Sequence, residues 1–209
     1  MDLINGNLLP EEIERLSFEI ISRELGERKI DEDKAGIVKR VIHASADFDY
    51  ADTLCFSENV VEKALSSIRG GASIVTDTKM ARAGINAGRL AFFGGSIHCF
   101  ISDEDVAERA RFEKTTRSAV SMEKALGLVD TPLIFAIGNA PTALIRLSAL
   151  IREGRLSPDL IVAAAVGFVN VVEAKEMVMA LDVPYIVTRG RKGGSNIAAA
   201  ICNALIYMC

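Results

Sequence analysis

Residues 160–166 read LIVAAAV, and this uninterrupted apolar run decides the fold class. It is followed by the loop GFVN at residues 167–170 and then by a helical period. Four more short apolar runs are arranged in the same way, at residues 72–75, 90–93, 133–137 and 184–187. Continuous apolar strands that alternate with helices are typical of a parallel sheet covered on both faces. The pattern predicts a three-layer αβα domain with a mostly parallel sheet.

Two helices are expected ahead of this sheet. The first spans residues 10–25 and ends at Gly26, because its apolar residues recur at spacings of three and four. These residues are Ile13, Leu16, Ile20 and Ile21. The second begins at Asp31 or Asp33 and buries a similar stripe, Ile37, Val38, Val41 and Ile42. Further helices are expected over residues 103–126 and 197–208, and with no linker or repeat the chain reads as one domain, residues 1–209.

Composition limits the partners of the chain. Its 209 residues carry 24 basic and 28 acidic side chains, a net charge of −4, and no Trp. This balance gives no general attraction to nucleic acid or to an anionic membrane, so neither is an expected partner. The longest apolar stretch, residues 160–169, is about half of the roughly 20 residues that a membrane span requires. Because the first ten residues lack a secretory pattern, a cytoplasmic location is expected.

The four cysteines are expected to be reduced thiols, mostly buried. They show no CxxC pair and no Cys/His spacing typical of zinc ligands. Neither a metal site nor a disulfide framework is therefore predicted. The residues are Cys55, Cys99, Cys202 and Cys209.

In open parallel sheets, ligands bind in loops at the carboxyl ends of the strands. These loops are expected at residues 76–79, 138–141, 167–170 and 188–196. The last, TRGRKGGSN, combines three glycines with three cations ahead of a helix. Glycines allow close approach of the backbone, and the cations and helix N-terminus favour an anion. The loop matches neither GxxxxGK[ST] nor GxGxxG, so it is either a different anion site or a solvated basic turn.

Three further side chains are candidates for a site. Of the two histidines, His98 reads as a structural or surface residue, whereas His43 shares a helix side with Lys39, Arg40 and Asp47. His43 is therefore either an acid or base or a helix-end residue that interacts with the dipole. Ser17 lies on the apolar stripe of the first helix and either bonds back to a carbonyl one turn earlier or contacts a ligand. Arg117 is either a surface residue or a carboxylate contact.

Five segments together resemble the precorrin-8X methylmutase family, in the family's order and over nearly the whole chain. They are residues 40–48 (RVIHASADF), 116–118 (TRS), 137–144 (IGNAPTAL), 167–175 (GFVNVVEAK) and 189–195 (RGRKGGS). The resemblance implies an isomerase that moves a methyl group from C-11 to C-12 of a contracted tetrapyrrole. The product is then hydrogenobyrinic acid, or cobyrinic acid where cobalt is already present, and no cofactor is needed.

The resemblance also implies roles for particular residues. His43 corresponds to the family's histidine, which protonates the macrocycle and triggers the rearrangement. Ser17 and Arg40 match positions around the substrate, as do Arg117 and the loop residues Lys192, Gly193 and Ser195. Family members are homodimers whose active site lies near the subunit interface, and this chain is expected to form one.

The residues themselves agree with such a substrate, a largely apolar disc that carries several carboxylates. Scattered cations, helix N-termini and an apolar slot would suit it. Methyl migration within one molecule calls for a proton donor and a shaped cavity, and His43 could be the donor. Two alternatives stay open: a non-catalytic corrinoid carrier on the same fold, and a nucleotide-dependent enzyme that uses residues 189–195 for phosphates.

Overall fold

The structure is a computed structural model that describes residues 9–128 and 130–209. Its strands are β1 (Leu54–Phe56), β2 (Ser73–Thr76), β3 (Ser96–His98), β4 (Leu133–Ile137), β5 (Leu160–Ala163) and β6 (Tyr185–Thr188). The helices are α1 (Pro10–Leu25), α2 (Glu32–Ser45), α3 (Tyr50–Thr53), α4 (Val60–Arg69), α5 (Lys79–Gly84), α6 (Ala87–Phe92), α7 (Glu104–Phe112), α8 (Arg117–Lys124), α9 (Pro141–Arg152), α10 (Val171–Met179) and α11 (Ser195–Met208), with a 3₁₀ turn at Ala125–Leu128.

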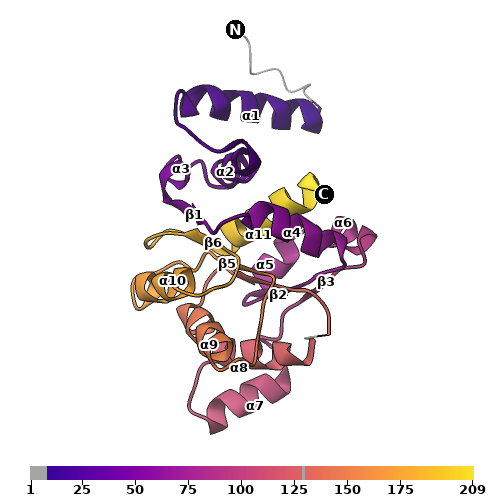
Figure 1. Ribbon diagram of the computed structural model, residues 1–209, viewed down its shortest axis with the longest axis vertical. Helices are drawn as coiled ribbons and strands as arrows, with labels where there is room; N and C mark the ends of the chain where they lie inside the picture. Colours follow the sequence, from indigo (N-terminus) through magenta and orange to yellow (C-terminus); the bar gives the residue numbers. More distant parts are fainter. Residues whose placement is uncertain (1–8, 129) are drawn as a thin grey trace.

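The strands form one six-stranded sheet in the order β1-β6-β5-β4-β2-β3. All neighbours are parallel except β1, which pairs antiparallel with β6. Helices α2, α4, α5 and α11 cover one face, and α8, α9 and α10 cover the other, with α7 outside α8 and α1 outside α2 (Figure 1). The predicted three-layer α/β class is confirmed. The antiparallel strand β1 was not foreseen.

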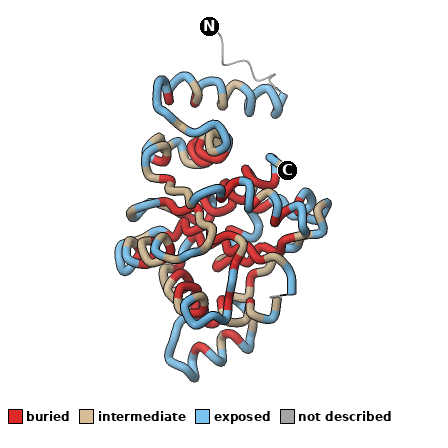
Figure 2. The backbone as a smooth tube through the Cα atoms, viewed as in Figure 1, coloured by how far each residue is buried: buried red, intermediate tan, exposed pale blue. Residues whose placement is uncertain are grey.

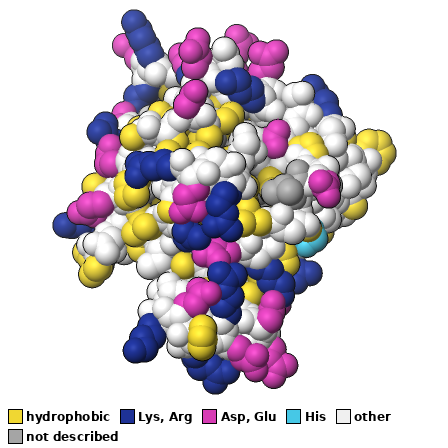
Figure 3. Space-filling view, turned by 60° about the horizontal axis from the view of Figure 1, so that its bottom comes forward, with side chains coloured by type: hydrophobic (Ala, Val, Ile, Leu, Met, Phe, Trp, Pro, Cys, Tyr) yellow, Lys and Arg dark blue, Asp and Glu magenta, His cyan; other side chains and the backbone are white. Residues whose placement is uncertain are grey.

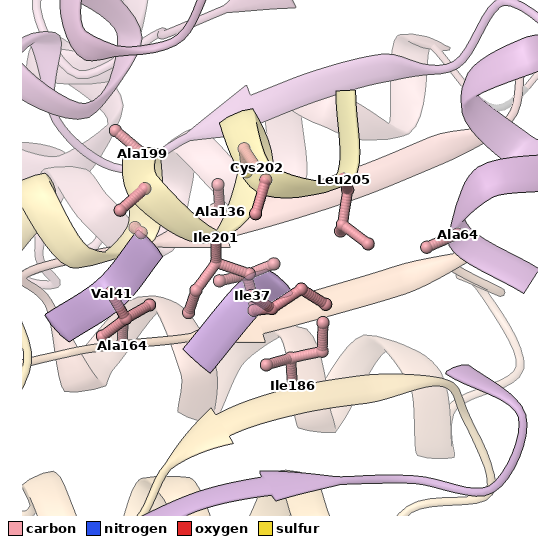
Figure 4. Close-up of a cluster of buried hydrophobic side chains, with 14 of the residues drawn as sticks. Ile37, Val41, Ala64, Ala136, Ala164, Ile186, Ala199, Ile201, Cys202 and Leu205 are labelled. Atoms are coloured by element: carbon pink, nitrogen blue, oxygen red, sulfur yellow. The ribbon is translucent and has the colours of Figure 1, made fainter. Parts of the chain in front are cut away.

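The core lies on both faces of the sheet. Helix α11 is sandwiched between α2 and the strands, and Ile201 and Leu205 point among Ile37, Ile186 and other apolar side chains (Figure 4). Alanines along α11 allow this close packing because they leave little volume between helix and sheet. Burial is densest in the strands and α11 and sparse along α1 (Figure 2). The described residues include no helix long and apolar enough to cross a membrane.

The two N-terminal helices form where they were predicted. Helix α1 spans Pro10–Leu25 and ends at Gly26 with φ +58°, and α2 follows Asp31 as its N-cap. All four predicted apolar residues of α2 are buried. On α1, in contrast, Ile13 and Ile20 remain 51% and 39% exposed. Part of the apolar stripe of α1 therefore has no partner within the described chain.

Two local predictions were wrong. Residues 90–93 were expected to form a strand, but they belong to the end of α6, and the strand here is β3 at Ser96–His98. The Asn86 side chain accepts a hydrogen bond from the Arg89 N–H, and this cap favours the helix. The single helix expected over residues 103–126 is divided into α7 and α8 by a turn in which Lys114 has φ +53°.

None of the four cysteines forms a disulfide in the described structure, and two of the four are buried, where most were expected to be. Cys99 and Cys202 are buried, and Cys55 and Cys209 are half-buried. Burial raises the pKa of Cys202 to about 12, so this thiol stays protonated at neutral pH. No group of three metal-binding side chains is found among the described residues.

Candidate functional site

The loops after β2, β4, β5 and β6 meet at one edge of the sheet, because these strands are parallel. Asp77, directly after β2, fixes the neighbouring loop. Its buried carboxylate accepts hydrogen bonds from the N–H groups of Gly138 (2.9 Å), Asn139 (2.9 Å) and Ala140 (2.7 Å). Burial raises the pKa of this carboxyl, and the three donors oppose that shift. The loop at the start of α9 is thus held rigidly in place.

The glycine-rich loop after β6 lies against the end of β5. The Gly194 N–H donates to the Ala164 carbonyl at 2.8 Å. A Cβ atom on Gly193 would lie 2.2 Å from the same carbonyl oxygen. Next to it, Ser195 begins α11 and its hydroxyl lies 2.7 Å from that of Thr78. Gly193 is therefore required by contact with the protein's own backbone, and the loop is tied to both β5 and the β2 loop.

Lys175 supports this loop from α10, although it was not predicted as a site residue. It is fully buried on α10, and its ammonium donates to the carbonyls of Gly190 (2.9 Å) and Lys192 (2.8 Å). Burial lowers the pKa of Lys175 to about 8. The sequence does indicate that Lys175 is buried. It lies four residues after Val171 and three before Val178, on the apolar side of a helix.

Two of the three cations in the loop already have carboxylate partners. The Lys192 ammonium contacts Asp47 and Asp49, both at 2.6 Å, and this holds the pKa of Lys192 above its usual range. Arg189 pairs with Glu176 at 3.0 Å. The third, Arg191, lies over the exposed Phe168 ring at 5.6 Å. An anion bound at this loop would meet Arg191 and backbone N–H groups first, and Lys192 after an exchange of partners.

His43 is exposed near the end of α2 and lines an apolar groove of about 230 Å³ between α1 and α2. Its ring lies 5.3 Å from that of Phe18. Ser17 lines the same groove and donates to the Ile13 carbonyl at 2.7 Å, the expected bond to the preceding turn. The groove is too small for a macrocycle, because pockets for drug-sized ligands alone measure about 300–1,000 Å³.

Arg40 lies beside this groove. Its guanidinium pairs with Glu14 at 2.9 Å and lies over the rings of Phe18 (5.3 Å) and Tyr207 (4.8 Å). Phe18 thus contacts both Arg40 and His43, and Ser17 shares a groove with His43, so the three predicted residues lie near one another. Of the neighbours expected for His43 on its own helix, Arg40 contacts this group, whereas Asp47 faces Lys192.

The groove and the glycine-rich loop are joined at the end of α2. Asp47 and Asp49 follow the helix and hold Lys192, and the Asn196 amide lies 3.5 Å from the Ala44 carbonyl. The groove at His43 and the loop at Lys192, Gly193 and Ser195 therefore form one candidate site. It lies on the face of the sheet that carries α2 and α11.

Arg117 lies elsewhere. It is the first residue of α8, exposed, and makes no ion pair with any residue that the structure describes. The preceding Thr116 donates to the Thr142 hydroxyl near the start of α9 at 2.9 Å, so Arg117 is near the loop after β4 but on the opposite face of the sheet from α2. On the face drawn in Figure 3, cations and carboxylates are interspersed rather than gathered into one basic patch.

Replacing Lys192 by methionine is expected to destabilise the protein at neutral pH and to have little effect in acid. The hydrogen bond from Lys192 holds the pKa of Asp47 below the usual value for an aspartate, so this pair stabilises the folded state at any pH above that usual value. The stabilisation disappears as the pH falls through the folded pKa. Urea unfolding of both proteins at pH 7 and pH 3 measures the effect, with Lys63→Met as the matched surface control. An equal difference in the free energy of unfolding between the wild type and Lys192→Met at both pH values would contradict the pairing.

Comparison with known proteins gives a consistent result. Residues 12–208 match the precorrin-8X methylmutase family. Cobalt-precorrin-8 methylmutase of Priestia megaterium is 44% identical over 94% of this chain and 87% of that protein. Precorrin-8X methylmutase of Pseudomonas aeruginosa is 37% identical over 92% and 93% of the two chains. The crystal structure of the precorrin-8X methylmutase of Thermus thermophilus superposes with a TM-score of 0.86, at 39% identity, over 94% of this chain and 96% of that one.

Proposed function

The chain belongs to the precorrin-8X methylmutase family, and from this premise we propose a reaction and a role for each residue of the candidate site. It is an isomerase of corrin biosynthesis that moves a methyl group within its tetrapyrrole substrate. The migration proceeds from C-11 to C-12 of the ring. No atom is gained or lost overall, so any proton that starts the migration is returned at its end.

His43 is the proton donor. The observation that carries this role is its position in an apolar groove that is joined through Asp47 and Lys192 to the strand-end loops. A proton delivered to the macrocycle makes the ring electron-poor and drives the methyl group to the adjacent carbon. The other histidine, His98, lies on the edge strand β3, where it bonds Ser96 and stacks on Phe100.

The remaining site residues bind the periphery of the macrocycle. Arg40 and Lys192 would exchange their present carboxylate partners for those of the substrate, and such pairs are charge-assisted. Ser17 lines the apolar groove, and Gly193 and Ser195 hold the loop in shape. Arg117 approaches from the other face of the sheet, beside the loop after β4 at the same carboxyl edge, and it supplies a cation that has no competing carboxylate within the described chain.

A second copy of the chain completes the site. The groove at His43 is smaller than a tetrapyrrole, and beside it Ile13 and Ile20 expose apolar surface. Covering such a stripe with the same surface of a second molecule is the usual solution in homodimers. The working enzyme is thus a homodimer, and we place it in the cytoplasm. Light scattering of the purified protein should give twice the mass of one chain.

The substrate is the cobalt-containing form. Four relatives that are 40–44% identical to this chain are cobalt-precorrin-8 methylmutases. They come from Priestia megaterium, Leptospira interrogans, Salmonella typhimurium and Methanocaldococcus jannaschii. The precorrin-8X methylmutases of Thermus thermophilus, Pseudomonas aeruginosa and a Sinorhizobium species are 39%, 37% and 33% identical. Two other cobalt-precorrin-8 methylmutases, of Methanothermobacter thermautotrophicus and a Synechocystis species, are 37% and 32% identical, so the proposal rests on the four relatives at 40–44%. Parallel assays with cobalt-precorrin-8 and the metal-free compound should give the higher kcat/KM for the former.

The function itself is tested by an assay that follows one substrate molecule to one product. The absorption spectrum should change while the mass stays constant, and ¹³C-labelled methyl groups followed by NMR should show one signal moving to a new carbon. Tight binding without any change of spectrum would instead indicate a carrier. Nucleotides should leave the melting temperature unchanged, since a protein with no nucleotide site gains nothing from their presence.

Replacing Arg117 by alanine is expected to raise KM about tenfold and to leave kcat within about threefold, because the lost contact is to a peripheral carboxylate. Stability should change by less than about 0.5 kcal/mol, since the side chain is exposed. Arg152→Ala, an exposed arginine at the other end of α9, is the control. A fall in kcat at constant KM would place Arg117 at the reacting carbons instead.

A further inference from the structure

Lys175 is a buried cation that the proposed reaction has not used. Its side chain is fully buried, and no carboxylate within the described chain pairs with it. Burying an ammonium without a counter-charge is costly, and an apolar side chain would fill the same space at lower cost. Both of its recorded hydrogen bonds go to the glycine-rich loop, to the carbonyls of Gly190 and Lys192.

These two bonds orient the loop. In a trans peptide, the N–H points away from the carbonyl, so the N–H groups of Arg191 and Gly193 point away from the Lys175 ammonium. Neither N–H donates a hydrogen bond to any other described residue. The neighbouring Arg191 carbonyl accepts from the Gly167 N–H at 3.2 Å, which holds the middle of the loop. The loop therefore presents two free donors on the side opposite the buried cation.

The charge of Lys175 adds to this geometry. An ammonium at 2.8–2.9 Å from two carbonyl oxygens polarises both peptide groups and makes their N–H groups stronger donors. In a low-dielectric interior the effect is larger than in water. Arg191 belongs to the same loop, and its guanidinium is the only side-chain cation of the loop without a carboxylate partner in the described structure. A carboxylate is the ligand that suits two backbone N–H donors and a guanidinium on one loop.

We propose that Lys175 is a positioning residue for the methyl migration, which holds residues 189–194 so that the N–H groups of Arg191 and Gly193 receive one peripheral carboxylate of the substrate. This inference rests on the proposed function, because it assigns the carboxylate to the tetrapyrrole. Lys175 itself does not touch the substrate. It acts through the loop that it supports.

Three variants separate the charge of Lys175 from its hydrogen bonds. Lys175→Met removes both, Lys175→Gln keeps a donor without the charge, and Lys175→Arg keeps the charge. Lys63→Met, an exposed lysine at the opposite edge of the sheet, is the control. We expect Lys175→Met and Lys175→Gln to raise KM about tenfold with kcat within about threefold, and Lys175→Arg to recover part of the loss.

Hydrogen exchange of the loop, measured without substrate, provides a second readout. The amides of Gly194 and Gly167, which donate to the Ala164 and Arg191 carbonyls, should exchange faster in Lys175→Met than in the wild type, and those in the middle of α11 should not. Unchanged KM and unchanged loop exchange in Lys175→Gln would overturn the proposal, even where Lys175→Met fails to fold. If the wild type and Lys63→Met both fail to convert the substrate, the proposed function is wrong, and the exchange data still decide whether Lys175 orders the loop.

Discussion

Replacing His43 by alanine should lower kcat for methyl migration by about 10²–10⁴-fold, the range that a positioned general acid contributes. The tetrapyrrole should stay bound, because its carboxylates are held by residues other than His43. The histidine is exposed and makes no hydrogen bond within the described chain, so the fold should lose little stability. Stopped-flow absorption measures turnover, and equilibrium titration with the product measures binding.

Two variants control this prediction. His43→Asn keeps a polar side chain of similar reach without an acidic proton near neutral pH, so it should be nearly as inactive as His43→Ala. His98→Ala removes the other histidine, on the edge strand β3, and should retain full activity. Turnover of His43→Ala near the wild-type rate would remove His43 from the mechanism and favour binding alone as the source of catalysis.

Gly193→Ala should destabilise the protein by about 3 kcal/mol and weaken substrate binding in whatever fraction still folds. The added Cβ would lie 2.2 Å from the Ala164 carbonyl oxygen and 2.7 Å from that of Ala165, so the loop must move away from β5. This displacement would break the bond from the Gly194 N–H to Ala164 and shift the carbonyls that Lys175 holds. Urea unfolding and product titration measure the two effects.

Gly190→Ala is the matched control in the same loop. Gly190 has φ +82°, and a Cβ there meets nothing within 4 Å. Its replacement should cost only backbone strain, roughly 1 kcal/mol, and leave the loop in place. If both variants lost the same stability, the close contact between Gly193 and β5 would not be the reason for the glycine.

Much of the fold could be predicted because its determinants are local. Helix α1 ends at Gly26 and α2 starts after Asp31, as the apolar spacing and the caps indicated. The strand expected at residues 90–93 does not form, and the reason is local as well. There the Asn86 cap outweighs an apolar run in which Phe92 remains 84% exposed.

The sequence named candidate residues for the site but could not predict their contacts. The motif around His43 and the glycine-rich loop were both visible in the sequence, and their resemblance to one family joined them. Nothing in either segment indicated that Lys192 would be held by Asp47 and Asp49, about 145 positions away. Lys175 was part of a recognised segment, but its role depends on which carbonyls it reaches.

The sequence by itself thus determined the parallel sheet, the two leading helices and the family, and it named His43 as the candidate for proton transfer. These follow from periodicity, caps and motifs, whose physical interactions extend over a few residues. Only the tertiary structure decided that Gly193 is required by the Ala164 carbonyl, that two cations of the loop are already paired, and that a buried ammonium supports the loop. Such contacts join residues distant in sequence, and packing of the whole core sets their distances.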